Sequence, residues 1–285
     1  MVSKLTGGLK TLSSFNKKSK SGKPLVSVIT VCLNSEKYIE QTIQSVINQT
    51  YDNIEYIIID GGSTDKTLDI IRKYEERIDY WVSEPDKGIY DAMNKGISFA
   101  DGEWVGIINS DDFYVKDTVK LVVEASRTDK EAQLFYGNLI KLDSRESDDL
   151  RNCRECKGQA DNMLESLSLN HPTCFVSSKI YAKLKFNTRF RIAADWDFCL
   201  RLHFSGIKFG YLNKPLVYFR PGGISEKSLL VVFENYRIRK RYDLKTALKQ
   251  LCLETRGRVI GNSPRPVVCF LRFGRRKIFG PARLF

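Results

Sequence analysis

The first 112 residues alternate short apolar segments with amphipathic ones, and this alternation constrains the fold more than any other feature. Segments 25–31, 54–59 and 104–108 are rich in Val and Ile and have the length of buried strands. Between the first two segments, apolar residues have helical spacing, at Ile39, Ile43, Val46 and Ile47. Strands that alternate with helices form a mostly parallel sheet with helices on both faces. The sequence therefore predicts an α/β domain of this kind.

Polar side chains follow each of these three predicted strands. They occupy residues 30–34, 60–65 and 109–112, and the last two ranges contain two Asp each. In open α/β sheets, ligands bind beyond the C-terminal ends of the parallel strands. We therefore expect a binding site at this edge of the sheet.

The segment Asn109-Ser110-Asp111-Asp112 is the strongest candidate within that site. Adjacent carboxylates at a strand end can hold a hard divalent cation through their oxygen atoms. Such a cation neutralises the charge that develops on a departing diphosphate. The alternative is that these residues cap the N-terminus of a following helix.

Two other carboxylates stand in similar contexts. Asp60 ends a predicted strand and precedes Gly61-Gly62, whose backbone can approach a nucleotide closely. Asp195 lies in the segment Ala193–Asp197 before a predicted helix, where a carboxylate can act as general base on an acceptor hydroxyl. The alternatives are a turn that caps a helix after Asp60, and N-capping in the second segment, which is the favoured interpretation for Asp197.

Charge is distributed unevenly along the chain. Of the formal net charge of +12, residues 1–24 carry +6 and residues 213–285 carry +13, which leaves −7 for residues 25–212. An acidic body suits a metal site, and basic ends suit an anionic membrane or a nucleic acid. The acidic body argues against a continuous groove for nucleic acid, so no nucleic-acid partner is expected.

Cysteine use and hydropathy indicate the compartment. The seven cysteines are an odd number, scattered through apparent core segments, which is typical of a reducing environment. No signal peptide and no run of about 18 apolar residues is visible. We therefore expect a cytoplasmic protein. Cys153 and Cys156 form a CxxC pair, but a structural zinc needs four ligands, so a surface loop is the better interpretation.

The ordered set of motifs resembles family 2 glycosyltransferases with the GT-A fold, in the branch that builds bacterial surface polysaccharides. The motifs include "DGGSTD", "INSDD", "NHPTCFVSS", "AADWDFCLRL" and "FRPGGIS". The resemblance implies a GT-A domain over 24–225, with a nucleotide-binding half (24–125) and an acceptor half (126–225). Residues 1–23 then form a flexible basic arm, and residues 226–285 a basic, partly helical extension.

The resemblance also implies roles for residues around the donor. Thr30 and Asn34 would flank the nucleotide pocket, and Asp60 would contact the base or ribose. Asp111 and Asp112 match the acidic metal motif of the family, and Asp112 is the preferred direct ligand. Two departures concern this region, because relatives often carry Asp where this chain has Gly61 and Asn109.

Other implied roles complete the site. Asp195 matches the catalytic base of the family. Asp86 and Lys87 would lie beside the donor, where Lys87 pairs with phosphate, and Asn94 would support that wall. His171 matches a position near the acceptor, and the alternative is a hydrogen-bonded structural histidine.

The implied reaction is an inverting transfer from a UDP- or GDP-sugar to a glycan or lipid-linked acceptor, assisted by Mg²⁺ or Mn²⁺. In segment 267–285, aromatic and apolar residues alternate with Arg and Lys. This mixture favours an anionic membrane surface, on the inner face of the plasma membrane, over a tail packed on the domain. The alternative function is a basic protein that binds nucleic acid or sugar nucleotides without transfer. Segment 32–36 lacks the Gly-rich loop of nucleotidylyltransferases and dehydrogenases.

Overall fold

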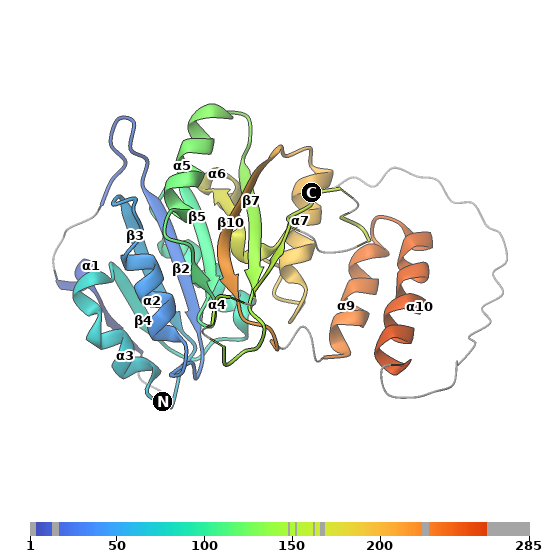
Figure 1. The fold of residues 1–285 in the computed structure, drawn as a ribbon, viewed down its shortest axis with the longest axis horizontal. Coiled ribbons are helices and arrows are strands. Elements are labelled where there is room, and N and C mark those ends of the chain that lie inside the picture. Colours follow the sequence, from blue (N-terminus) through green and yellow to red (C-terminus); the bar gives the residue numbers. More distant parts are fainter. Residues whose placement is uncertain are drawn as a thin grey trace.

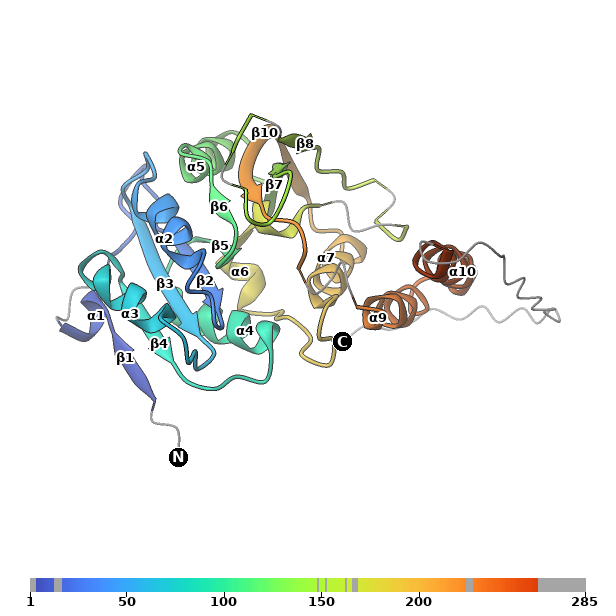
Figure 2. The ribbon, with the colours of Figure 1, turned by 60° about the horizontal axis from the view of Figure 1, so that its bottom comes forward.

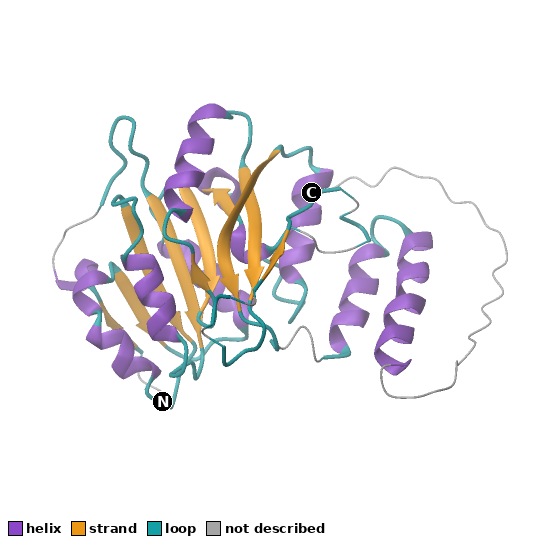
Figure 3. Ribbon diagram, viewed as in Figure 1, coloured by secondary structure: helices purple, strands orange, loops and turns teal. Residues whose placement is uncertain are grey.

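A single ten-stranded sheet forms the centre of the computed structural model (Figure 3). The structure describes residues 4–12, 17–147, 149–151, 153–161, 163–165, 169–223 and 228–260. The strands are β1 (Leu5–Gly7), β2 (Val26–Cys32), β3 (Ile54–Asp60), β4 (Tyr80–Ser83), β5 (Trp104–Asn109), β6 (Phe113–Tyr114), β7 (Leu134–Lys141), β8 (Arg154–Cys156), β9 (Phe175–Ser177) and β10 (Phe209–Phe219). Their order is β1-β4-β3-β2-β5-β9-β7-β10-β6, and β8 pairs with β7.

Six of these ten strands run in the same direction, namely β2, β3, β4, β5, β7 and β10. Every residue of β2 and β3 is buried, as expected for central strands covered on both faces. The predicted mostly parallel sheet is therefore confirmed. The three strands expected from the apolar runs begin and end within one residue of β2, β3 and β5.

Helices cover both faces of the sheet (Figure 1). They are α1 (Leu9–Leu12), α2 (Ile39–Ile47), α3 (Thr67–Lys73), α4 (Ile89–Phe99), α5 (Thr118–Thr128), α6 (Ser178–Tyr181), α7 (Ala194–Phe204), α9 (Leu230–Arg239) and α10 (Leu244–Ile260), with short 3-10 turns at Glu75–Arg77 and His171–Thr173. Apolar side chains of α2, α3 and α5 form one core cluster with the sheet, and those of α4, α6 and α7 form the other. Because the two clusters alternate along each central strand, successive strand residues serve opposite cores.

Strands β9 and β6 bring the second half of the chain to the first. β9 lies antiparallel between β5 and β7 and thus joins the two halves into one sheet. β6 follows Asp112 directly and pairs with the end of β10, through Phe113 opposite Tyr218. This pairing places the residues after β10 beside the acidic segment after β5.

The N-terminal residues differ from the prediction of a flexible arm. β1 pairs with β4 in an antiparallel register, so it adds an edge strand to the sheet. The Lys10 ammonium lies 2.5 Å from Glu55 and 2.7 Å from Asp101. Glu55 is fully buried, and a buried carboxylate is costly without a partner. This pair helps to hold residues 5–12 on the sheet, although that stretch has no periodicity.

The C-terminal extension is helical where it is described. In Figures 1 and 2, α9 and α10 lie side by side, and α9 lies next to α7. None of the helices in the described ranges combines the length and apolar character that a bilayer span requires. The proposed membrane-binding segment 267–285 lies outside the described residues.

Candidate active site

Asp60 organises the turn at the end of β3. Its Oδ2 accepts hydrogen bonds from the backbone N–H of Gly62 (3.2 Å) and Ser63 (3.0 Å), and from the Ser83 hydroxyl (2.6 Å). The Asp60 side chain is fully buried. The carboxylate therefore fixes the shape of the glycine turn, and its contact with a base or ribose stays a prediction.

Gly61 is explained by its neighbour Asp86. A Cβ atom at position 61 would lie 2.6 Å from Asp86 Oδ2, so a larger residue would collide with that carboxylate. Asp86 Oδ1 accepts the N–H of Gly88 (2.8 Å), which immediately precedes α4. Burial raises the pKa of Asp86. The carboxylate of Asp86 thus lies beside position 61, where relatives often have a second Asp. Lys87, the next residue in the chain, is exposed.

Three other predicted donor residues have distinct surroundings. Thr30 is buried within β2, and its hydroxyl lies 3.0 Å from the Tyr56 hydroxyl. The Asn94 side chain exchanges two hydrogen bonds with the backbone of Phe186, at 2.9 and 3.0 Å. Asn34 is exposed, has a left-handed φ of 50°, and accepts the N–H of Thr64 at 2.9 Å. Of these three side chains, Asn34 is the one exposed at the edge.

The acidic pair follows β5 and does not cap a helix, because β6 begins at the next residue. The alternative of helix capping is therefore wrong here. Asp112 is 1% exposed, and its Oδ1 accepts the backbone N–H of Arg220 at 3.0 Å. Burial, together with the charge of Asp111, raises the pKa of Asp112 well above its usual range. The Asp111 carboxylate is more accessible and lies 2.8 Å from the Arg145 guanidinium.

Several observations test whether a divalent cation fits this place. Among the described residues, Asp112 Oδ2 and Asn109 Oδ1 are buried oxygen atoms without a hydrogen-bond donor. The Arg145 guanidinium already supplies a positive charge to Asp111. Within the described ranges, no three acidic, His or Cys residues gather as a complete ligand set. Mg²⁺ and Mn²⁺ commonly use one or two carboxylates and take further ligands from phosphates and water, so the residues fit such a cation.

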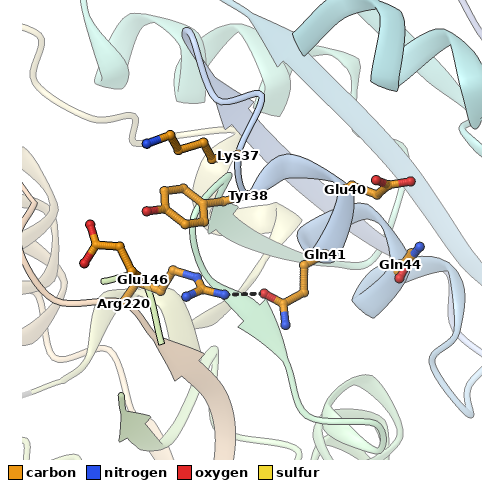
Figure 4. Close-up of a pocket in the computed structure, with 7 residues that line it drawn as sticks. All are labelled: Lys37, Tyr38, Glu40, Gln41, Gln44, Glu146 and Arg220. Atoms are coloured by element: carbon orange, nitrogen blue, oxygen red, sulfur yellow. Dashed lines mark hydrogen bonds between the residues drawn. The ribbon is translucent and has the colours of Figure 1, made fainter. Parts of the chain in front are cut away.

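A cavity of about 500 Å³ (Figure 4) has Arg220 in its wall, although neither member of the acidic pair lines it. Arg220 connects the two, because its backbone binds Asp112 while its guanidinium stacks 4.8 Å from the ring centroid of Tyr38 and donates to Gln41 at 2.5 Å. The lining residues are Lys37, Tyr38, Glu40, Gln41, Gln44, Glu146 and Arg220.

Asp195 lies in the first turn of α7 and is held by Tyr90. The Tyr90 hydroxyl lies 2.9 Å from Asp195 Oδ1 and 2.6 Å from the carbonyl oxygen of Ile192. Tyr90 belongs to the first turn of α4, which begins where the loop of Asp86 ends at the sheet edge. This contact joins the second half of the chain to the helix that follows the Asp86 loop. Burial lowers the pKa of His171, and the charge of Asp195 opposes that shift.

The N-cap of α7 is Ala193, so neither carboxylate after it is the cap residue. Asp197 is fully buried and pairs with Arg201 (2.8 Å) and Arg241 (2.7 Å). The favoured interpretation of Asp197 as an N-cap is therefore wrong. The described cysteines are all free, and Cys153 and Cys156 are partly buried.

Sequence reasoning missed the residues that hold the site together, namely Tyr90, Arg145 and Arg220. A lone Tyr or Arg carries no local pattern that predicts a distant carboxylate partner. For Arg220 a signal existed, because it stands in the "FRPGGIS" motif, but the motif alone assigns it no partner.

A mostly parallel sheet with acidic residues at its C-terminal edge is the arrangement that the resemblance to GT-A glycosyltransferases implies. Residues 27–185 match the family described as Glycosyl transferase family 2. A "PGL/p-HBAD biosynthesis glycosyltransferase" of Mycobacterium bovis is 30% identical over 186 residues, which cover 62% of this chain and 69% of that protein. The chain belongs to glycosyltransferase family 2.

Two solved structures share the fold. Residues 1–349 of S. aureus TarS, in complex with UDP-GlcNAc, match with a TM-score of 0.61 at 20% identity, over 84% of this chain and 73% of that one. The mannosyltransferase PcManGT from Pyrobaculum calidifontis, in complex with GDP-Man and Mn²⁺, matches with a TM-score of 0.55 at 18% identity, over 86% of this chain and 66% of that one. This chain spans 42% of the longer TarS chain.

Proposed function

We propose that this glycosyltransferase moves one sugar from a UDP- or GDP-sugar to a glycan or lipid-linked acceptor in polysaccharide biosynthesis, with inversion at the anomeric carbon. The contact between Tyr90 and Asp195 carries the proposal, because it sets a carboxylate from the acceptor half against the helix that begins at the donor edge. TarS and PcManGT, which share the fold, were solved with UDP-GlcNAc and GDP-Man.

In the proposed reaction, Asp195 removes the proton of the acceptor hydroxyl as its oxygen attacks the anomeric carbon of the donor. The bond from that carbon to the diphosphate breaks, and the nucleoside diphosphate leaves with the bonding electrons. One displacement inverts the configuration. Asn34, Asp60, Asp86 and Lys87 line or shape the edge that receives the nucleotide. Thr30 and Asn94 act through the scaffold, since their side chains bond to protein groups.

We assign the direct contact to a Mg²⁺ or Mn²⁺ ion to Asp111. Asp112 was the preferred ligand from sequence, but it is 1% exposed and its Oδ1 accepts the Arg220 N–H, which leaves only the buried Oδ2 and makes the accessible Asp111 the better placed of the two. A bound cation would neutralise charge on the departing diphosphate. Asp112 supports Asp111 by fixing the segment between β5 and β6.

Location at the cytoplasmic face of the membrane is part of the proposal. The basic segments at the two ends of the chain suit anionic lipid, and a lipid-linked acceptor would be presented there.

A thermal-shift screen tests the proposed donor. UDP, GDP and their sugars are each added with and without Mn²⁺. One nucleotide at about 100 times its Kd should add about 2.7 kcal/mol of stability, a rise of roughly 5–10 °C in Tm, with Mn²⁺ present. The matching sugar nucleotide should then be slowly hydrolysed, and NMR of the released sugar should report inversion. If no nucleotide raises Tm in the presence of Mn²⁺, the proposal is wrong.

Arg145 provides a second test of the cation site. Its guanidinium occupies the charge-balancing position on Asp111, so a metal must compete with it. Arg145→Ala is expected to tighten Mn²⁺ binding in the absence of nucleotide by several-fold. The metal then no longer has to replace the ion pair between Arg145 and Asp111, and a pair near the surface contributes about 1 kcal/mol or less. Titration of Mn²⁺ by electron paramagnetic resonance measures this. Arg151→Ala, whose partner Asp149 lies outside the site, is the matched control. Weaker Mn²⁺ binding in Arg145→Ala would contradict the competition.

A further inference from the structure

A buried glutamate in the C-terminal extension binds the segment that precedes Asp195. Glu234 of α9 is 3% exposed. Its Oε1 accepts the N–H of Arg191 at 2.8 Å, and its Oε2 accepts the N–H groups of Ile192 at 2.9 Å and Ala193 at 3.0 Å. A carboxylate is rarely buried unless its oxygens are hydrogen-bonded. Three consecutive backbone donors on one carboxylate fix both the position and the direction of this segment.

The segment held by Glu234 leads directly into the site. Ala193 is the N-cap of α7, and Asp195 follows two residues later. The carbonyl of Ile192 lies 2.6 Å from the Tyr90 hydroxyl, which also contacts Asp195 Oδ1. Glu234 therefore fixes the backbone that leads into Asp195. It also fixes Ile192, whose carbonyl oxygen accepts a hydrogen bond from the Tyr90 hydroxyl.

The residues just after Asp195 are held by the same extension. The Arg239 guanidinium lies 4.5 Å from the ring centroid of Trp196 and donates to the carbonyl of Leu164 at 2.8 Å. Arg241 pairs with Asp197 at 2.7 Å. Contacts from residues 234–241 thus bracket Asp195 on both sides.

We propose that Glu234 is a positioning residue for Asp195, so that the extension after β10 is part of the catalytic unit. The inference rests on the proposed function, because that function assigns Asp195 as the general base. Glu234 acts through the backbone of residues 191–193 and needs no contact with substrate. A small displacement of a general base lowers kcat much more than it lowers the affinity for substrate, because proton transfer requires the base to lie within hydrogen-bond distance of the hydroxyl.

The first experiment compares Glu234→Gln and Glu234→Ala with wild type. Gln keeps the shape and one oxygen acceptor but turns an NH₂ group toward backbone donors, whereas Ala removes all three bonds. We expect kcat to fall about 10-fold for Gln and about 100-fold for Ala, with the Kd for nucleoside diphosphate and Mn²⁺ unchanged. Asp243→Asn is the matched control, because Asp243 bonds to Lys245 and Thr246 at the start of α10 and does not touch residues 191–197.

The second experiment is a double-mutant cycle with Asp195→Asn. If Glu234 acts through Asp195, Glu234→Gln should cause no further loss of residual turnover in the Asp195→Asn protein. Equal fold losses in both backgrounds would overturn the inference, as would wild-type kcat in Glu234→Gln. Unchanged nucleotide Kd shows that a variant is folded, and if Glu234→Ala is unstable the Gln variant decides. Full turnover in Asp195→Asn would instead refute the proposed base, which distinguishes the two failures.

Discussion

Asp195→Asn is expected to lower kcat for sugar transfer by about 10²- to 10⁴-fold, the range for loss of a positioned general base. Asn keeps the shape and an oxygen acceptor for the Tyr90 hydroxyl, which now lies 2.9 Å from Oδ1, so the local structure should persist. The Kd for nucleoside diphosphate should not change, because Asp195 lies on α7, outside the strand ends that we propose receive the nucleotide. Calorimetry and initial rates with a good acceptor measure the two quantities.

Asp69→Asn is a suitable control for this prediction. Asp69 lies on α3, its side chain is 78% exposed, and its contact with Arg72 is a long one of 3.9 Å. Its kcat and Kd should equal those of wild type. Turnover of Asp195→Asn within about tenfold of the control would mean that another group takes the proton.

Asp111→Asn is expected to weaken Mn²⁺-dependent binding of nucleoside diphosphate by more than about 100-fold, and Asp112→Asn by about 10- to 100-fold. The smaller range is typical of residues that orient a metal ligand without touching the ion. Asp111 is the accessible carboxylate of the pair, whereas Asp112 is buried against Arg220. Calorimetric titration with nucleoside diphosphate, with Mn²⁺ and with chelator, measures both losses.

Thermal unfolding without metal separates the two roles further. Asp112→Asn keeps the oxygen that accepts the Arg220 N–H and removes a desolvated charge, so this variant should be at least as stable as wild type. A larger loss of metal affinity in Asp112→Asn than in Asp111→Asn would restore Asp112 as the direct ligand. Wild-type affinity in both variants would place the cation elsewhere.

Local patterns predicted the central sheet and the sheet edge at which the polar strand ends lie. A continuous apolar run identifies a strand buried on both faces, and the helix-forming segments between the runs require parallel neighbours. The registers that pair Cys32 with Asp60 and Val31 with Asn109 then bring both polar ends to one edge. The same reasoning failed at the N-terminus, because the docking of Lys10 depends on the buried Glu55 and on no periodicity of its own.

The sequence by itself therefore determined the α/β class, the parallel core strands and the edge that carries Asp60 and the Asp111–Asp112 pair. Only the tertiary structure decided how those carboxylates are held. Tyr90 and Asp195 are in contact although they lie 105 residues apart in the sequence, and Arg220 and Asp112 although they lie 108 residues apart. Hydrophobic periodicity is a local property, so it can be recognised in a short segment without knowledge of the rest of the chain. The partner of a charged or phenolic group is set by the folding of distant segments against each other, so no local pattern encodes it.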